Sequence, residues 1–147
     1  MARYVTKVRT PRSVEEAFAY MADLRNFAEW DPGVTAAVQV EGGGGGPGTA
    51  FDVTVQSPGR DLTLRYVTVE HTPPTFVRVV AESRFLTSDD SVTVEADGDQ
   101  TVVTYQADLM LNGVLGVVDP LLRLMFGRIG DRAAAGLREA LEGVEVT

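Results

Sequence analysis

The sequence DPLLRLMFGRIGDRAAAGLREALEG, residues 119–143, predicts the longest helix of the chain. It begins with Asp119, a residue type that caps helix N-termini, and Pro120 follows at the first helical position, where proline is favoured. It ends at Gly143, a typical helix terminator. At a rise of about 1.5 Å per residue, the segment 120–142 would be about 34 Å long. The stretch therefore predicts one long C-terminal helix.

The two halves of this helix differ in polarity. Residues three or four positions apart form an apolar stripe along its whole length, namely Leu122, Phe126, Ile129, Ala133, Leu137 and Leu141. In the N-terminal half, Leu121, Leu124 and Met125 add apolar surface beside the stripe. A wrapped sheet, a second subunit or a bound ligand would each cover this extra surface.

Upstream of the helix, the pattern changes to period two, which is typical of strands. Alternation begins at Val34, Ala36, Val38 and Val40, and Tyr4 to Arg9 form an earlier strand. Five more runs are expected at 49–56, 61–70, 76–83, 88–96 and 101–110. Their connections are short and rich in glycine, proline and aspartate, which favours an antiparallel meander.

Two short helices are predicted between the first strand and the meander. Ser13 and Glu16 form a capping box for the first, and Asp23 caps a second brief turn. The stretch NFAEWDPGV, residues 26–34, then contains the only tryptophan, Trp30, beside a tight turn. We interpret Asp31 as the side-chain acceptor of that turn, and Trp30 as an aromatic residue that closes one end of the sheet and lines a pocket entrance.

Composition narrows the class of function. A chain of 147 residues suits one domain, and its net charge of -8 disfavours nucleic acid as a partner. The absence of cysteine excludes disulfides and thiolate sites, and no segment has the uninterrupted apolar length of a signal peptide or transmembrane helix. We therefore expect a cytoplasmic protein.

Several short segments carry a family resemblance. They are Ser13 to Phe18, Asn26-Phe27 with Trp30 and Pro32-Gly33, Val69-Glu70 before Pro73-Pro74, and Asp99 to Tyr105. With the predicted order of elements, they make the chain similar to the START-like, Bet v 1-like (SRPBCC) superfamily, specifically its polyketide cyclase/dehydrase-like branch of small bacterial proteins. The resemblance covers essentially the whole length.

That resemblance implies a fold and a cavity. The fold is one α+β helix-grip domain over residues 1–147, in which a curved antiparallel sheet of about seven strands wraps around the C-terminal helix. A cavity between sheet and helix would hold a small hydrophobic ligand, while no particular reaction is implied. The alternative is that the same side chains interdigitate and fill the space.

Strand parity, the apolar N-terminal half of the long helix and the turn beside Trp30 predict which side chains line that interior. The expected ligand-binding residues are Trp30, Phe51, Val53, Leu64, Tyr66, Val79, Ala81, Tyr105, Ala107, Leu109, Leu122, Met125, Phe126 and Ile129. Arg78, Glu82, Gln106 and Asp108 are expected on the opposite face. On this assignment the tyrosines are the only ionisable groups inside, and the catalytic residues stay unknown.

Other motifs give little support for a metal or phosphate site. The glycine run at 42–48 opens no helix, so it lacks the context of a phosphate-binding loop. His71 has no second histidine or cysteine to complete a zinc site, and the acids near Asp90 lack the spacing of a calcium loop. We expect no metal and no cofactor.

Three functions remain open. The first is binding of a hydrophobic ligand, either aromatic and polyketide-like or lipidic. The second is a cyclase or dehydratase that positions a reactive poly-carbonyl chain and moves protons. The third is a regulatory protein whose apolar helix surface binds a partner chain; a monomer or a homodimer suits any of them. The lack of a predicted carboxylate in the interior favours the first.

The pocket entrance is expected at three features. These are Trp30, the glycine loop 42–48, and the end of the long helix with Leu121, Leu122 and Met125. Five consecutive glycines exceed what a tight hairpin needs, which favours a flexible rim.

Overall fold

The computed structural model describes residues 2–42, 46–56, 61–83, 86–111 and 119–145, with only the backbone described at positions 2, 111, 119–126 and 145. Its elements are β1 (Ala2–Thr10), α1 (Val14–Ala22), the 3-10 helix η1 (Leu24–Asn26), α2 (Phe27–Trp30), β2 (Val34–Glu41), β3 (Ala50–Val55), β4 (Leu62–Thr72), β5 (Phe76–Glu82), β6 (Leu86–Asp97), β7 (Gln100–Leu111), α3 (Asp119–Ala140) and β8 (Val144–Glu145). In these described parts, none of the helices combines the length and apolar character that a membrane crossing requires.

The described strands form one antiparallel sheet in the order β2-β3-β4-β5-β6-β7-β1-β8. Six consecutive strands make the predicted meander, and β1 joins it beside β7. The expected α+β helix-grip fold is therefore confirmed, with the two-residue β8 as an addition to the seven predicted strands.

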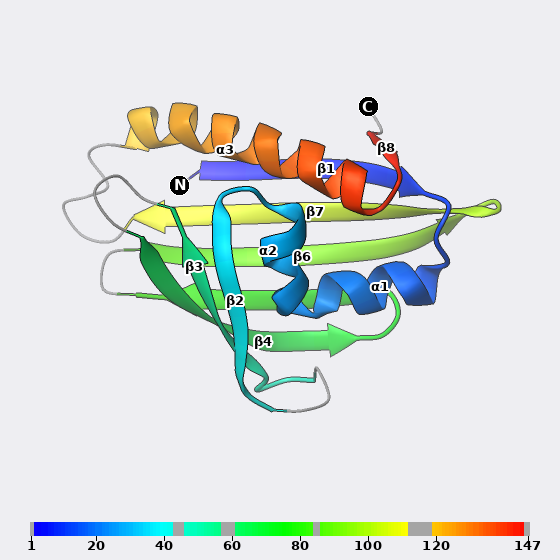
Figure 1. Cartoon of the computed structure of the whole chain (residues 1–147), viewed down its shortest axis with the longest axis horizontal. Helices are drawn as coiled ribbons and strands as arrows, with labels where there is room; N and C mark the ends of the chain where they lie inside the picture. The colour runs from blue at the N-terminus through cyan, green and yellow to red at the C-terminus, as the bar shows by residue number, and fades with distance from the viewer. Residues whose placement is uncertain (1, 43–45, 57–60, 84–85, 112–118, 146–147) are drawn as a thin grey trace.

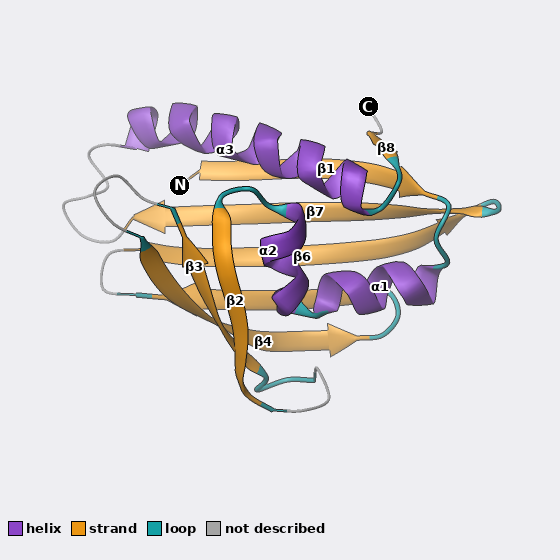
Figure 2. Cartoon of the chain, viewed as in Figure 1, coloured by secondary structure: helices purple, strands orange, loops and turns teal. Residues whose placement is uncertain are grey.

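The helices lie on one face of this sheet (Figure 2). α3 runs along β1, α1 contacts β6 and β7, and α2 lies between α3 and β2. The sheet is strongly curved, because β2 and β3 run steeply across the direction of β6 and β7 (Figure 1). Sheet and helices thus enclose an interior between them.

The predicted strand faces are confirmed in the central strands. Val77, Val79 and Ala81 of β5 are buried. On the opposite face, Arg78 pairs with Asp89 at 2.7 Å. The alternation of these strands therefore identifies the face that meets the helices.

β2 departs from its simple alternation. The pairing with β3 shifts register between Val34 and Ala36 and again between Gln39 and Glu41, so β2 has one extra residue at each of these two points. Val34 is buried, whereas Val38 and Val40 are 57% and 39% exposed. The three valines that look equivalent in sequence therefore lie on different faces.

The C-terminus of α3 is fixed by the end of β1. Arg12 donates to the carbonyl of Ala140 at 3.0 Å, and Thr10 donates to the carbonyl of Leu141 at 2.6 Å. The helix ends earlier than the predicted Gly143. Glu142 adopts the positive φ of 54° that ends the helix, and Gly143 is needed because a Cβ there would lie 2.4 Å from the carbonyl oxygen of Arg9.

Glycines bring α3 close to the rest of the fold. A Cβ at Gly136 would lie 1.8 Å from the carbonyl oxygen of Trp30. A Cβ at Gly130 would lie 2.3 Å from the ring of Tyr4. Backbone and ring occupy the space that a side chain would need, so both positions require glycine.

Gly136→Ala should therefore destabilise the protein although alanine favours helices. The methyl group meets a backbone carbonyl that cannot rotate away, and such overpacking typically costs about 1–3 kcal/mol. Gly127→Ala is the matched control in the same helix, because nothing lies within 4 Å of its Cβ position. The control should gain up to about 1 kcal/mol from helix propensity. Urea denaturation measures both, and equal effects would show that α3 does not need this close approach.

Candidate functional site

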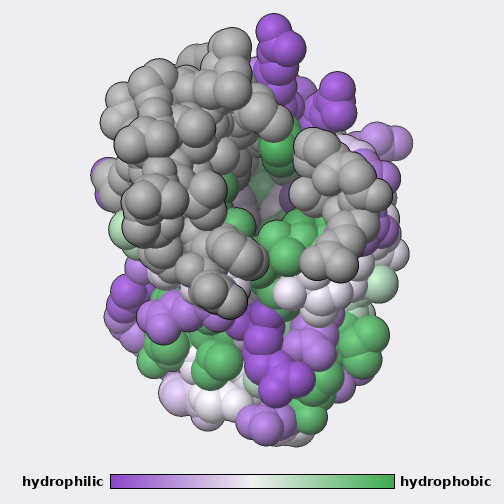
Figure 3. Space-filling view, turned by 90° about the vertical axis from the view of Figure 1, so that its left-hand side faces the viewer, coloured by the Kyte–Doolittle hydropathy of each residue, from purple (hydrophilic) through white to green (hydrophobic). Residues whose placement is uncertain are grey.

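A large pocket opens between the curved sheet and α3. Its volume is about 630 Å³, and we call it the main pocket. Its lining consists of Phe27, Asp31, Pro32, Gly33, Val34, Val53, Val55, Gln56, Asp61, Leu62, Leu64, Tyr66, Leu86, Ser88, Asp90, Tyr105, Ala107, Leu109, Ile129 and Arg132. Figure 3 views the molecule from its left-hand end and shows a hollow with hydrophobic side chains beside it.

A chain of four hydrogen-bonded side chains forms the polar part of this lining. The Tyr66 hydroxyl donates to Ser88 Oγ at 2.9 Å, and Ser88 Oγ donates to Asp90 Oδ1 at 2.8 Å. From the other side, the Tyr105 hydroxyl donates to Asp90 Oδ2. β4, β6 and β7 thus contribute to one network that ends on a single carboxylate.

Asp90 is buried, with 3% of its surface exposed. Burial is the main cause that raises the pKa of Asp90 to about 6, and the hydrogen bonds from Tyr105 and Ser88 oppose it. Burial also raises the pKa of Tyr66 and of Tyr105 well above the ordinary value. Near neutral pH, the tyrosines are therefore proton donors in hydrogen bonds, and Asp90 is the group that titrates.

Asp31 is a second carboxylate in the main pocket. Its Oδ1 accepts a hydrogen bond from the backbone N–H of Gly33 at 2.8 Å, which is the turn role predicted from the sequence. Burial raises the pKa of Asp31, and the hydrogen bond from Gly33 opposes that shift. The turn therefore also brings an acid to the wall of the pocket.

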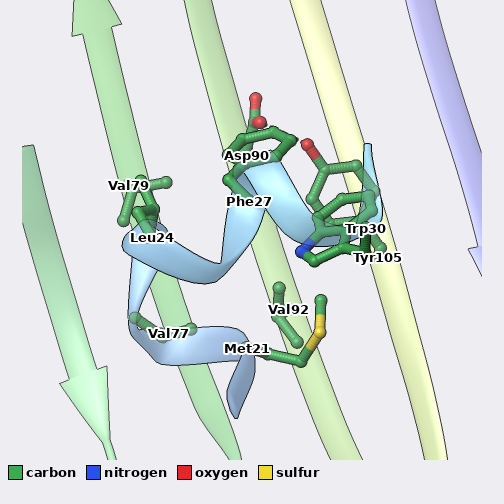
Figure 4. Close-up of a pocket in the computed structure, with 9 residues that line it drawn as sticks. All are labelled: Met21, Leu24, Phe27, Trp30, Val77, Val79, Asp90, Val92 and Tyr105. Carbon is green, nitrogen blue, oxygen red and sulfur yellow. Dashed lines mark hydrogen bonds between the residues drawn. The ribbon is translucent and has the colours of Figure 1, made fainter. Parts of the chain in front are cut away.

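Trp30 is not among the residues that line the main pocket. Its ring stacks on Phe27 with centroids 4.7 Å apart and meets Tyr105 edge-on at 5.3 Å. Figure 4 shows this cluster around a small inner pocket of about 20 Å³, which Met21, Leu24 and Asp90 also line. Trp30 is 5% exposed, so it fills the end of the sheet.

The predicted site residues fall into four groups. Seven line the main pocket, namely Val53, Leu64, Tyr66, Tyr105, Ala107, Leu109 and Ile129. Trp30 and Val79 line the inner pocket. Phe51 and Ala81 are buried core residues outside the described pocket linings. The side chains of Leu122, Met125 and Phe126 lie outside the described part of the chain.

The prediction for the glycine loop is wrong for its described residues. The backbone N–H of Gly48 bonds to the carbonyl of Thr68 at 2.9 Å, and Thr68 lies in β4 away from Leu62 and Leu64, which line the main pocket. At the other end of β3, Val55 and Gln56 belong to the lining. Figure 1 shows that β2 ends and β3 begins on one side of this strand pair, opposite to the side on which β3 ends. The described glycines of this loop, Gly42, Gly46 and Gly48, therefore do not belong to the lining of the main pocket.

The expectation that only tyrosines are ionisable inside is also wrong, because Asp90 and Asp31 line the main pocket. A signal for Asp90 exists in the sequence. Val92 and Val94 are buried residues of β6, and counting back in steps of two reaches Asp90 and Ser88. Strand parity alone would therefore have placed both polar residues inside. Across the described ranges, no three histidine or acidic side chains gather as a metal site would require.

The sequence matches one family model over residues 1–142, and that family is described as polyketide cyclase / dehydrase and lipid transport. The chain belongs to this family. The match agrees with the resemblance seen in the sequence. A search of curated proteins gives no significant match.

Solved structures share the fold of this polyketide cyclase / dehydrase family member. A START superfamily protein from Mycobacterium smegmatis has a TM-score of 0.78 and 12% identity, with 97% of this chain and 98% of that chain covered. A protein from Thermus thermophilus has a TM-score of 0.76 and 15% identity, covering 95% and 96%. The Zhui aromatase/cyclase from a Streptomyces species has a TM-score of 0.73 and 12% identity, covering 95% and 90%. At these identities, the likeness shows the fold alone.

The raised pKa of Asp90 predicts a pH-dependent stability. The folded protein binds this proton at a higher pH than the unfolded chain, whose Asp pKa is about 3.9, so stability falls as pH rises from about 4 to 6. The full effect is on the order of 3 kcal/mol. Asp90→Asn should remove it, as urea denaturation over a pH series can measure.

Tyr105→Phe provides a second test of the same carboxylate. It removes a hydrogen bond that lowers the pKa of Asp90, so the titration should move upward from about 6. Carboxyl NMR can follow it directly. If the wild type and Asp90→Asn show parallel pH profiles, the folded-state pKa of Asp90 is not raised.

Proposed function

We propose that the protein binds a small hydrophobic ligand in the main pocket. The ligand is either aromatic and polyketide-like or lipidic. The observation that carries this proposal is a pocket of about 630 Å³ with mainly apolar walls and a few polar groups. Typical small-molecule sites have volumes of roughly 300–1,000 Å³ and this same composition. The family description, which includes lipid transport, supports the same function.

The energy available from the walls is sufficient for such a ligand. Covering about 200 Å² of apolar wall gains about 5 kcal/mol at roughly 25 cal/mol per Å², before the costs of association. Leu64 from β4, Ala107 from β7 and Ile129 from α3 supply wall from three separate elements. Ile129 is 47% exposed although it faces the pocket, so apolar surface remains there for a ligand to cover.

Ala107→Phe tests this function by filling the pocket without adding a charge. Nile red, a neutral apolar dye, should bind the wild type with enhanced fluorescence and bind Ala107→Phe at least about tenfold more weakly, since overpacking is costly. Ala96→Phe is the control, because Ala96 is an exposed residue of β6. Equal dye affinity in all three proteins, with unchanged melting temperatures, would contradict binding in this pocket.

A second function is favoured by one observation, the buried Asp90 beside two tyrosines. A general base works best when its pKa lies near the operating pH, and the pKa of Asp90 is about 6. In a cyclase or dehydratase, the carboxylate of Asp90 would take a proton from a carbon between two carbonyl groups. Tyr105, which donates to the same carboxylate, would hold it in position.

If the protein has this enzyme function, Asp90→Asn should lower the turnover rate much more than it weakens substrate binding. With a poly-carbonyl substrate, Asp90→Asn should lower the rate about a hundredfold or more, because a proton acceptor typically contributes that much. Substrate binding should change far less, since the amide has nearly the same shape. Product formation followed by mass spectrometry measures the rate. Unchanged turnover in Asp90→Asn would exclude Asp90 as the base.

A further inference from the structure

The directions of the hydrogen bonds at Asp90 restrict what a ligand can offer there. Tyr66 gives its proton to Ser88, Ser88 gives its proton to Asp90, and Tyr105 gives its proton to Asp90. All three hydroxyl protons are therefore used within the network. The carboxylate accepts two hydrogen bonds from these groups, while an ionised carboxylate offers about four acceptor positions. The free capacity at this end of the pocket is for accepting hydrogen bonds.

The charges around Asp90 favour the same kind of ligand. Asp31, which follows α2, lines the same pocket as a second acid, and the third acid of the lining, Asp61, is exposed. The groups that face Asp90 from β4 and β7 are the phenols Tyr66 and Tyr105, while Asp89, its neighbour on β6, pairs with Arg78 on the opposite face. Among the described lining residues, Arg132 of α3 is the one cation, and it is exposed. A carboxylate ligand at this end would meet two acids without a buried cation.

We infer that the main pocket selects hydrophobic ligands that bring a hydrogen-bond donor to Asp90, a phenolic or enolic hydroxyl or a protonated amine, and that it rejects carboxylates. The inference rests on the proposed binding function and narrows its ligand class. It separates hydroxylated aromatic or amine ligands from fatty acids, which the size of the pocket alone would admit. A donor from the ligand would use the remaining acceptor positions of Asp90, and an ammonium group would also compensate its buried charge.

A matched series on one ring system tests this selection. The probes are 2-methylnaphthalene, 2-methoxynaphthalene, 2-naphthol, 2-(aminomethyl)naphthalene and 2-naphthoate, titrated by calorimetry at pH 7.5. The hydroxyl and aminomethyl compounds should bind about tenfold or more tightly than the methyl and methoxy compounds, since hydrogen bonds to charged groups are worth that much. The naphthoate should bind most weakly. A stronger gain for the amine than for the phenol identifies charge compensation as the larger contribution.

Asp90→Asn is the decisive variant, because it removes the charge and adds an amide donor. The advantage of the aminomethyl compound should fall about tenfold or more, and the naphthoate should bind more tightly than it does to the wild type. Asp89→Asn is the control, since Asp89 is the adjacent residue on the opposite face, and it should leave the ranking unchanged.

Two outcomes would overturn the inference, and they are distinguishable. If the methyl compound binds but the wild type does not rank the probes by donor capacity, or Asp90→Asn keeps the wild-type ranking, selection by Asp90 is wrong while hydrophobic binding stands. If none of the five probes binds, the proposed binding function fails together with the inference.

Discussion

The close contact between α3 and the turn after α2 is the constraint on which the interior depends. Gly136 lets the helix backbone approach the carbonyl of Trp30, and the adjacent Ala133 and Leu137 are buried. Toward the N-terminus of the helix, Ile129 and Arg132 line the main pocket. The helix is therefore tightly packed along one part and borders an open space along another. A larger residue at 136 would move the helix and change the shape of that space.

Burial of the polar network in the main pocket costs free energy, although the groups of the network are hydrogen-bonded to one another. A buried carboxylate loses its hydration, which is why the pKa of Asp90 rises toward neutrality. Two hydroxyl donors from different strands offset part of this loss. Because the donors come from β6 and β7, the network also requires the two strands to keep one register, in which Asp90 lies opposite Ala107. A one-residue slip would turn Asp90 to the solvated face.

Interactions between residues that are close in the sequence explain why the fold could be predicted from it. Capping at Ser13, the turn at Asp31 and the two-residue period of β5 depend on neighbouring residues, and the structure contains all three. The exposure of Val38 could not be predicted, because a register shift in β2 is set by its pairing with β3. The position of Gly48 likewise depends on the pairing of distant strands, because its backbone N–H bonds to the carbonyl of Thr68 in β4.

Asp90 was missed for a different reason. An acid in a strand is typical of a solvated face, and only the two-residue step back from Val92 and Val94 indicates that Asp90 lies on the inner face. The donors that make burial acceptable are Tyr105, 15 positions further along, and Tyr66, 24 positions earlier through Ser88. Their convergence is visible only once the strands are paired. Sequence reasoning therefore identified the walls of the pocket better than its chemistry.

The position of β1 has a consequence for the order of folding. β1 pairs with β7 on one side, where Ala2 lies opposite Leu109, and with β8 on the other. Its partners are therefore separated from it by most of the chain, and such long-range pairing closes slowly. During synthesis, β1 can form its native pairing only after β7 has emerged, and Thr10 and Arg12 can bond to the end of α3 only later still. The pocket would thus be one of the last features to form, when the whole described chain is in place.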